Sequence, residues 1–238
     1  MAKWQERAAL LFKEEGLNKL KNSNVLVVGL GGVGSFAAEF LVRAGVGTMT
    51  IVDGDTVDIT NINRQLPALH STVGQPKVKI VGDRLMDINP ELNLIRVEEF
   101  LSPDRATEIV TPEFDYVLDC IDSLTPKINL LVAAKRKKIK VISNMGAGGK
   151  FDVNKVVVRD ISKTEVCPLA KNIRKRLRKQ GINKGVKAVY SMEHPDATSI
   201  KTTDGSNYKK SFYGTNSWMP ALFGIHAAET VVKHLIKK

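Results

Sequence analysis

The sequence predicts an α/β protein with a mostly parallel twisted sheet, helices on both faces of the sheet, and antiparallel strands added in the C-terminal half. Three features of the 238 residues support this prediction. Short apolar runs alternate with helix-like stretches as far as residue 144, a glycine-rich turn follows the first of these runs, and the pattern changes from residue 145. Such alternation is typical of parallel strands joined by crossover helices.

The elements of the first half follow from hydrophobic spacing. A leading helix is expected over residues 7–20, where leucines recur near helical spacing. Runs of apolar and β-branched residues predict strands at 24–28, 48–52, 94–99, 116–119 and 140–143, and the stretches between them predict helices at 33–44, 75–88 and 125–137.

The turn after the first strand reads GLGGVGS, in which Gly29, Gly31 and Gly34 give the spacing GxGxxG. The first glycine permits a tight turn, the second lets the backbone approach a phosphate, and the third lets helix and strand pack closely. The helix that follows offers unpaired N–H groups to an anion. Asp53 ends the second strand, about 20 residues on, where a carboxylate can accept from ribose hydroxyls. The turn therefore predicts a Rossmann-like nucleotide-binding fold.

Cations and amides follow Asp53 in the segment DGDTVDITNINRQLPALHSTVGQPK. An ATP attacked at its α-phosphate needs its triphosphate neutralised, for which Arg64 offers a bidentate fork and Lys77 a mobile charge. Asn61 and Gln65 can hold the phosphates or the ribose through neutral hydrogen bonds. Each residue alone also fits an ordinary loop, turn or cap position, so their joint spacing is what favours an ATP site.

The run VLDCIDS ends a predicted strand at Asp119 and places Asp122 and Ser123 in the loop after it. Ligands bind at the carboxyl ends of parallel strands in open α/β sheets. Asp122 can therefore hold Mg²⁺ on the phosphates, since one or two carboxylates usually do so. Asp122 also fits the N-cap of the next helix, and the two roles are compatible.

The second half predicts a strand at 155–160, a basic helix at 169–180, and an amphipathic helix from about Pro220. The loop at about 192–211 has too few apolar residues to offset the entropy of ordering it, so we expect it to be flexible. We therefore expect a single domain over residues 1–238. Its parts are an N-terminal helical arm at 1–23, a nucleotide-binding half at 24–144, and a C-terminal half at 145–238 that contains the basic crossover segment and the flexible loop.

The chain is strongly basic, with 36 Lys and Arg against 25 Asp and Glu and a formal charge of +11. This excess suggests a polyanionic partner, although solubility alone is the alternative explanation. The run from Ala170 to Lys187 holds eight basic residues, with Ile173 and Leu177 at helical spacing. It predicts a helix that packs by one face and turns its charges toward RNA phosphates, or a merely solvated helix.

The cysteines and the hydropathy of the chain indicate in which cellular compartment the protein is expected. Cys120 and Cys167 form no CxxC pair, which predicts neither a disulfide framework nor a zinc site and fits a reducing cytoplasm. The N-terminal segment is charged within its first turn, and the longest apolar stretch near the C-terminus is interrupted by His226, Glu229 and Lys233. We therefore expect no signal, no anchor and no membrane insertion.

Five motifs follow one another between Val25 and Asn144: GLGGVGS, VDGDTVDITNINRQ, VGQPK, DINP and DCIDS. In this order and spacing they resemble the ThiF/MoeB/HesA superfamily, the bacterial relatives of ubiquitin-activating enzymes. Further stretches are similar to one branch, the tRNA threonylcarbamoyladenosine dehydratases: LLFKEEGLNKLKNSNVLVVG, DSLTPKINLL, AGGK and SWMPALFGIHAAE. The CxxC pairs that hold zinc in many carrier-protein activators are absent, which favours the dehydratase branch.

The resemblance implies an adenylating homodimer that uses ATP and Mg²⁺. On the matching positions Arg64 and Lys77 are the expected catalytic residues, together with Arg7, which would reach the triphosphate of the neighbouring subunit. Asp122 is the expected metal ligand. The expected nucleotide-binding residues are Gly29, Gly31, Gly32, Gly34, Asp53, Asp55, Asn61, Arg64, Gln65, Lys77, Asp122 and Ser123.

The reaction implied by the resemblance is adenylation of the threonyl carboxylate of threonylcarbamoyladenosine in tRNA, followed by cyclisation and release of AMP and pyrophosphate. The alternative is an adenylyltransferase that activates the C-terminal Gly-Gly of a ubiquitin-like sulfur-carrier protein of the thiamine or molybdopterin type. An NAD-type Rossmann enzyme and a non-catalytic RNA-binding module are more distant alternatives. The expected partners are tRNA, a second copy of the chain and, for the alternative reaction, a carrier or sulfur-transfer protein.

Overall fold

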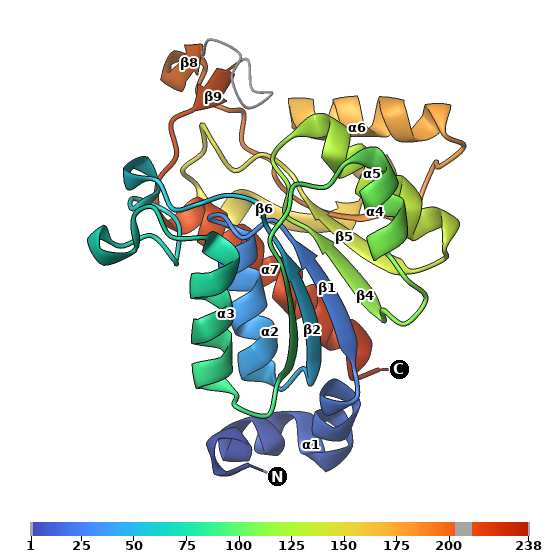
Figure 1. The fold of residues 1–238 in the computed structure, drawn as a ribbon. Helices are drawn as coiled ribbons and strands as arrows, with labels where there is room; N and C mark the ends of the chain where they lie inside the picture. Colours follow the sequence, from blue (N-terminus) through green and yellow to red (C-terminus); the bar gives the residue numbers. More distant parts are fainter. Residues whose placement is uncertain (1, 203–210, 238) are drawn as a thin grey trace.

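The computed structural model describes residues 2–202 and 211–237. Its centre is a seven-stranded sheet in the order β3-β2-β1-β4-β5-β7-β6 (Figure 1). All neighbouring strands are parallel except β6 and β7, which are antiparallel, and β8 and β9 form a separate antiparallel pair. The strands are β1 Asn24–Val28, β2 Thr48–Val52, β3 Asn93–Val97, β4 Tyr116–Asp119, β5 Lys140–Asn144, β6 Val156–Asp160, β7 Lys187–Ser191, β8 Ile200–Thr202 and β9 Ser211–Tyr213.

Helices cover both faces of the sheet, and each face has its own core. Val25 and Val27 of β1 pack in the core that includes α2, α3 and α7, whereas Leu26 and Val28 pack in the core that includes α4, α5 and α6. A strand that is buried on both faces has a continuous apolar sequence, and NVLVV is such a sequence, so it predicts β1 correctly. The helices are α1 Glu6–Lys21, α2 Gly34–Ala44, α3 Lys77–Ile88, α4 Pro103–Ile109, α5 Leu124–Arg136, α6 Pro168–Lys179 and α7 Trp218–Leu235.

The predicted fold class is confirmed, and the structure adds α4, β7 and the short strands β8 and β9, the last two within or at the end of the expected loop. The sequence analysis assigned no helix to α4, although Ser102 at its N-cap accepts from the Arg105 N–H and Pro103 follows as the first helical residue. It also assigned no strand to β7, whose sequence KAVYS has little β-branched content but is buried at four of its five positions. Tertiary burial, rather than local propensity, makes β7 a strand.

The order of strands reverses between β1 and β4, so the carboxyl ends of these two strands border the crevice where such sheets bind ligands. The glycine turn joins β1 to α2 at this end of the sheet, the upper end of both elements in Figure 1. Helix α1 lies at the opposite end, where the backbone of Lys21 touches Gly47, and it is interrupted by a positive φ at Lys13. The predicted arm is therefore remote from its own nucleotide turn.

The polar loop expected at about 192–211 is only partly described, because residues 203–210 lie outside the described residues. Within the described part, the Glu193 carboxylate accepts from the N–H groups of Phe151 and Asp152, and β8 pairs with β9. Flexibility of this loop and the division of the chain at residue 144 stay predictions. Within residues 2–202 and 211–237, no helix is both long enough and apolar enough to cross a membrane.

Candidate nucleotide-binding site

The glycine turn is built so closely that side chains are excluded from it. Gly29 has φ +91°, and a Cβ there would lie 2.8 Å from the carbonyl oxygen of Cys120. A Cβ at Gly34 would lie 1.7 Å from the carbonyl oxygen of Gly29, so any side chain would push the start of α2 away from β1. The turn thus holds the N-terminus of α2 close to the end of β1, where unpaired N–H groups attract an anion.

Asp53 at the end of β2 is joined to this turn by hydrogen bonds. Its carboxylate accepts from the Leu30 N–H at 2.6 Å and from the Asp55 N–H at 2.8 Å. Burial raises the pKa of Asp53, and these two hydrogen bonds counteract only part of that effect. The carboxylate therefore has a fixed position beside the backbone that the sequence analysis assigned to phosphate.

Arg64 reaches the same crevice from the segment between β2 and α3. Its Nη1 donates to the carbonyl oxygen of Thr60 and to Asn63 Oδ1, both at 2.8 Å, which fixes the guanidinium. Burial lowers the pKa of Arg64, while the charges of Asp122 and Asp58 oppose the shift. The charge of Asp122, predicted to bind metal, therefore acts on Arg64, predicted to bind phosphate.

Lys77 is the first residue of α3, and only 5% of its side chain is exposed. Its Nζ lies 2.9 Å from the Asp55 carboxylate, which is itself 56% exposed, and its N–H donates to the Asp55 carbonyl oxygen. The exposed partner leaves one side of the ion pair open to solvent, so a phosphate oxygen could approach the same ammonium there.

Two amides complete this side of the crevice. Asn61 is buried, and its Oδ1 accepts from the Asp58 N–H at 3.3 Å. The Gln65 amide lies next to the turn. If Gly31 carried a Cβ, that atom would lie 3.6 Å from Gln65 Nε2. Its Oε1 is buried and meets no hydrogen-bond donor in the part of the chain that the structure describes. Buried acceptors are normally satisfied, so this atom is suited to a donor on a ligand.

The loop after β4 supplies Asp122 and Ser123. Ser123 Oγ donates to Asp122 Oδ1 at 3.3 Å, and α5 begins at Leu124 with Ser123 at the N-cap position. The alternative reading of Asp122 as the N-cap is therefore wrong, because the helix starts one residue later than that reading required. Among the described residues, no cluster of three or more His, Cys, Asp or Glu side chains is placed to hold a metal by itself.

Arg7 is not part of this crevice within one chain. It lies exposed near the start of α1, at the end of the molecule opposite the glycine turn. Gly32, by contrast, lies in the turn itself. A Cβ on Gly32 would lie 3.0 Å from both the Arg64 carbonyl oxygen and the Pro220 side chain, so α7 also borders the site.

A buried ion pair that was not predicted from the sequence lies behind the loop that carries Asp122. Lys127 Nζ lies 2.6 Å from Asp119 Oδ2 and donates to the Asn144 carbonyl oxygen at 2.9 Å. Ser143 Oγ also donates to Asp119. Neither charged side chain is exposed, and burial raises the pKa of Asp119 against the effect of Lys127. A signal was present, because Lys127 stands beside Ile128 and Leu131 on the apolar side of its predicted helix.

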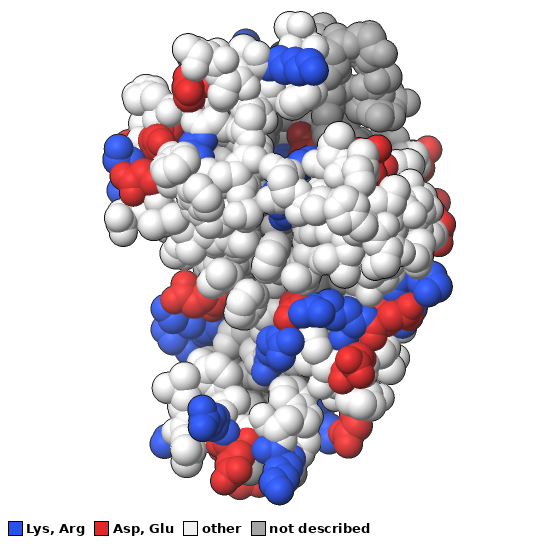
Figure 2. Space-filling view, turned by 90° about the vertical axis from the view of Figure 1, so that its left-hand side faces the viewer, with Lys and Arg blue, Asp and Glu red and all other residues white. Residues whose placement is uncertain are grey.

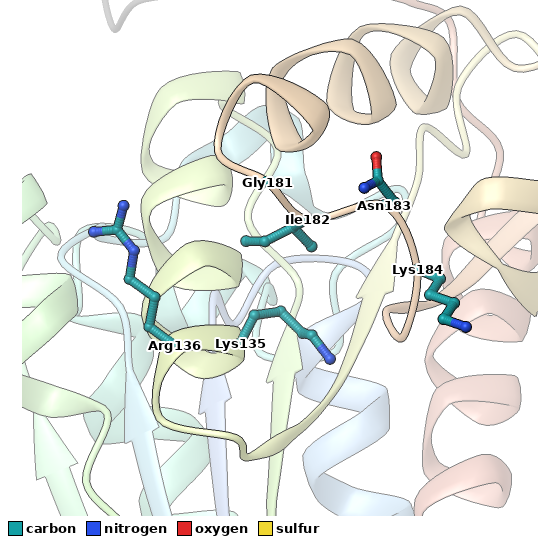
Figure 3. A pocket seen from close by; sticks show the side chains of 6 residues that line it. All are labelled: Lys135, Arg136, Gly181, Ile182, Asn183 and Lys184. Carbon is teal, nitrogen blue, oxygen red and sulfur yellow. The ribbon is translucent and has the colours of Figure 1, made fainter.

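A separate cavity of about 300 Å³ lies between the end of α5 and the loop after α6 (Figure 3). Its lining is basic and includes Lys135, Arg136 and Lys184, with the Lys135 amine donating to the Gly185 carbonyl oxygen. The cavity is remote from the glycine turn, so it is distinct from the crevice described above.

The chain is similar to known proteins over nearly its whole length. The tRNA threonylcarbamoyladenosine dehydratase of Bacillus subtilis (strain 168) is 43% identical, over 97% of this chain and 94% of that protein. The crystal structure of Escherichia coli tRNA N6-threonylcarbamoyladenosine dehydratase, TcdA, in complex with ATP superposes with a TM-score of 0.88 at 34% identity, covering 100% of this chain and 96% of that one.

A second group of relatives matches a smaller part of the chain. The molybdopterin-synthase adenylyltransferase of Salmonella typhimurium (strain LT2) is 38% identical over 66% of this chain and 61% of that protein. The model of the ThiF family matches residues 5–238. The chain therefore belongs to the ThiF family, on the branch of the tRNA threonylcarbamoyladenosine dehydratases.

Proposed function

We propose that this protein is an ATP-dependent dehydratase that adenylates the threonyl carboxylate of threonylcarbamoyladenosine in tRNA and allows it to cyclise. The observation that carries the proposal is the position of Asp53 and Arg64 against the glycine turn, with Lys77 paired to the neighbouring Asp55, in a chain that matches dehydratases over nearly its whole length.

The residues divide the binding of ATP between them. The glycine turn and the N-terminus of α2 receive phosphate, and Asp53 accepts from the ribose hydroxyls. Arg64 and Lys77 neutralise the phosphate oxygens, Arg64 through a planar fork and Lys77 as a point charge. Asn61 and Gln65 supply neutral hydrogen bonds to the same ligand, with the buried Gln65 Oε1 as an acceptor.

Mg²⁺ fits the donor set at the loop after β4. Mg²⁺ is usually held by one or two carboxylates together with substrate phosphates and water. Asp122 would supply that carboxylate. The negative charge of Asp122 already acts on Arg64, because it raises the pKa of the guanidinium against the effect of burial. When bound, the ion would supply additional neutralisation of the phosphate charge.

The chemistry converts a poor leaving group into a good one. A carboxylate oxygen attacks the α-phosphorus of ATP, the bond to the bridging oxygen breaks, and pyrophosphate leaves. The carbamoyl group of the same modification then attacks the activated carbonyl and expels AMP, and the intramolecular geometry favours this step over attack from outside. The net change on the base is the loss of one water molecule. Arg64 and Lys77 stabilise the charge that develops on the phosphates.

We further propose a homodimer in which Arg7 of each subunit serves the neighbouring site. The position of Arg7 at the far end of its own subunit is consistent with such an arrangement. The central band of the face shown in Figure 2, above its charged lower half, is mostly free of charged side chains. The segment between β2 and α3 lies on that side of the molecule and exposes Ile59, Leu69 and Val73, so this face is suited to a second copy.

The tRNA is expected to reach the basic surface of α6. Ile173 and Leu177 bury one side of this helix, while Lys171, Lys175 and Arg178 are exposed on the other. The basic cavity of Figure 3 adjoins the same helix and extends this surface. Phosphate contacts of this kind position an RNA without reading its bases. We place the reaction in the cytoplasm, where tRNA and ATP are available.

Mass spectrometry of tRNA carrying threonylcarbamoyladenosine tests the proposal. After incubation with the protein and Mg-ATP, we expect the modified adenosine to lose the mass of one water molecule while AMP and pyrophosphate form. An unchanged tRNA, together with adenylation of a Gly-Gly carrier protein, would establish the carrier-protein alternative instead. Tight binding of NADH with hydride transfer would contradict adenylation altogether.

A further inference from the structure

Phe151 and Trp218 form an exposed aromatic pair at the edge of the nucleotide crevice. Their ring centroids are 4.8 Å apart and their planes meet at 89°. Phe151 is 69% exposed and Trp218 41%, although apolar rings of this size are usually buried. Neither ring has a role in the function proposed above.

The pair is held rigidly by polar contacts. Trp218 Nε1 donates to the Phe151 carbonyl oxygen at 3.1 Å, so the only donor of the indole is occupied while 41% of the residue stays exposed. The Asn216 side chain donates to the Lys150 carbonyl oxygen and accepts from the Met219 N–H, which joins the start of α7 to the loop after β5. Rings fixed in this way lose little entropy when a flat ligand stacks on them.

The pair lies beside the phosphates rather than beside the nucleoside of ATP. Trp218 is two residues before Pro220, whose side chain contacts Gly32 of the glycine turn. Phe151 follows β5, which lies on one side of β1, whereas Asp53 ends β2 on the other side. An ATP whose ribose reaches Asp53 therefore directs its adenine away from the aromatic pair.

The charged groups near the rings are already paired within the protein. The Glu193 carboxylate accepts from the N–H groups of Phe151 and Asp152, and the Asp152 carboxylate lies 3.7 Å from Lys155 Nζ. The exposed rings themselves are therefore the feature that a ligand can use, and a nucleobase binds such rings through its π-face.

We propose that the Phe151–Trp218 pair is the platform on which a splayed-out nucleobase of the RNA substrate stacks, an inference that rests on the proposed function. The atoms between N6 of the modified adenine and its carboxylate span roughly 5 Å, given ordinary bond lengths. A carboxylate at the α-phosphate thus requires the base to lie just outside the phosphate site. Single-stranded bases of RNA are typically bound by such aromatic stacking.

Tryptophan fluorescence tests this inference directly. The chain has two tryptophans, so the Trp4→Phe variant leaves Trp218 as the only tryptophan, which is then excited selectively over the tyrosines. We expect a stem-loop RNA carrying threonylcarbamoyladenosine to quench Trp218, and the same RNA with an abasic site at that position to quench it much less. Mg-ATP alone should leave the emission unchanged, as should dilution of the protein without RNA.

The outcomes separate this inference from the proposed function. RNA that binds by fluorescence anisotropy without quenching Trp218, or quenches it equally when abasic, overturns the platform and leaves the proposed function standing. Quenching by Mg-ATP alone assigns the rings to the adenine of ATP, and a change on dilution assigns them to a second copy; either result overturns the platform. RNA that does not bind at all overturns the proposed function and the inference with it.

A pair of variants at Trp218 gives a second readout. Trp218→Ala should raise the KM for the RNA by about tenfold, the value expected from the loss of one stacked base, and leave the KM for ATP unchanged. Trp218→Phe keeps a ring and should restore most of the loss. Stacking would be contradicted if both variants raised the KM for the RNA equally, or if only the KM for ATP rose.

Discussion

The ammonium of Lys127 lies 2.6 Å from the carboxylate of Asp119, and neither side chain is exposed to solvent. Asp119 ends β4 and Lys127 lies in α5, so the pair spans the loop that carries Asp122. Lys127 also donates to the Asn144 carbonyl oxygen at the end of β5. The pair thus fixes the loop on which the metal ligand is proposed to lie relative to two neighbouring strands.

Removing Lys127 should be strongly destabilising. Lys127→Met leaves the Asp119 charge buried without its counter-ion, which typically costs about 3–5 kcal/mol. We expect a loss of this size in the free energy of urea unfolding at neutral pH. The double variant Lys127→Met/Asp119→Asn should recover part of it, because it removes both charges. A single variant as stable as the parent would show that the pair contributes nothing to stability.

How far the sequence could predict this molecule depends on where each interaction lies. The turn from Gly29 to Gly34 and the strands β1, β2 and β4 are local, because their glycine spacing and their apolar runs are contiguous in sequence. The buried pair of Lys127 and Asp119 is not local, since its partners become neighbours only when β4, β5 and α5 pack together. Likewise β7 is a strand because of burial between β5 and β6, which its own residues do not encode.

A second stability prediction concerns Glu39, which joins α2 to α3. Its carboxylate accepts from Arg43 Nε at 2.8 Å and from Arg84 Nε at 2.6 Å. Burial acts to raise the pKa of Glu39, but the hydrogen bonds from the two arginines outweigh burial and lower the pKa below its ordinary 4.5. The stabilisation is therefore complete above pH 4.5 and is lost as pH falls through the lower pKa of the folded state.

The Glu39→Gln variant tests this predicted pH dependence of stability. We expect the variant to lose about 1–2 kcal/mol of unfolding free energy at neutral pH, a modest value because both arginines are half exposed. The difference from the parent should shrink as the pH is lowered below 4.5. Urea unfolding at several pH values measures this, and a difference that is constant with pH would refute the ionic explanation.

The proposed role of Arg7 in the neighbouring subunit can be tested by mixing inactive variants. Arg7→Ala and Lys77→Ala homodimers should each be strongly impaired in AMP formation. Mixed dimers should regain part of the activity, because one of their two sites then contains both a wild-type Lys77 and a wild-type Arg7 from its neighbour. Mixed dimers that stay inactive, with both variants folded, would place Arg7 in its own site or outside the reaction.

Turnover should not depend on a thiol. Burial raises the pKa of Cys120 to about 12, with the charge of Asp119 contributing, so the nucleophilic thiolate is scarcely populated. Cys167 is 4% exposed at the start of α6. We expect the Cys120→Ala/Cys167→Ala variant to form AMP with tRNA at the rate of the parent protein. Loss of turnover in a folded double variant would favour a cysteine relay and hence the carrier-protein alternative.

The last prediction concerns the salt dependence of RNA binding. Each phosphate neutralised by Lys or Arg releases counter-ions, so the affinity falls linearly with salt on logarithmic axes and the slope reports the number of contacts. Replacing Lys171, Lys175 and Arg178 by Gln should reduce that slope by about 2 and weaken binding to all RNA sequences alike. The matched control replaces Lys79, Lys233 and Lys237, which lie on α3 and near the C-terminus. An equal effect of both triple variants would show that net charge alone drives binding, whereas an effect confined to the first assigns the phosphates to α6.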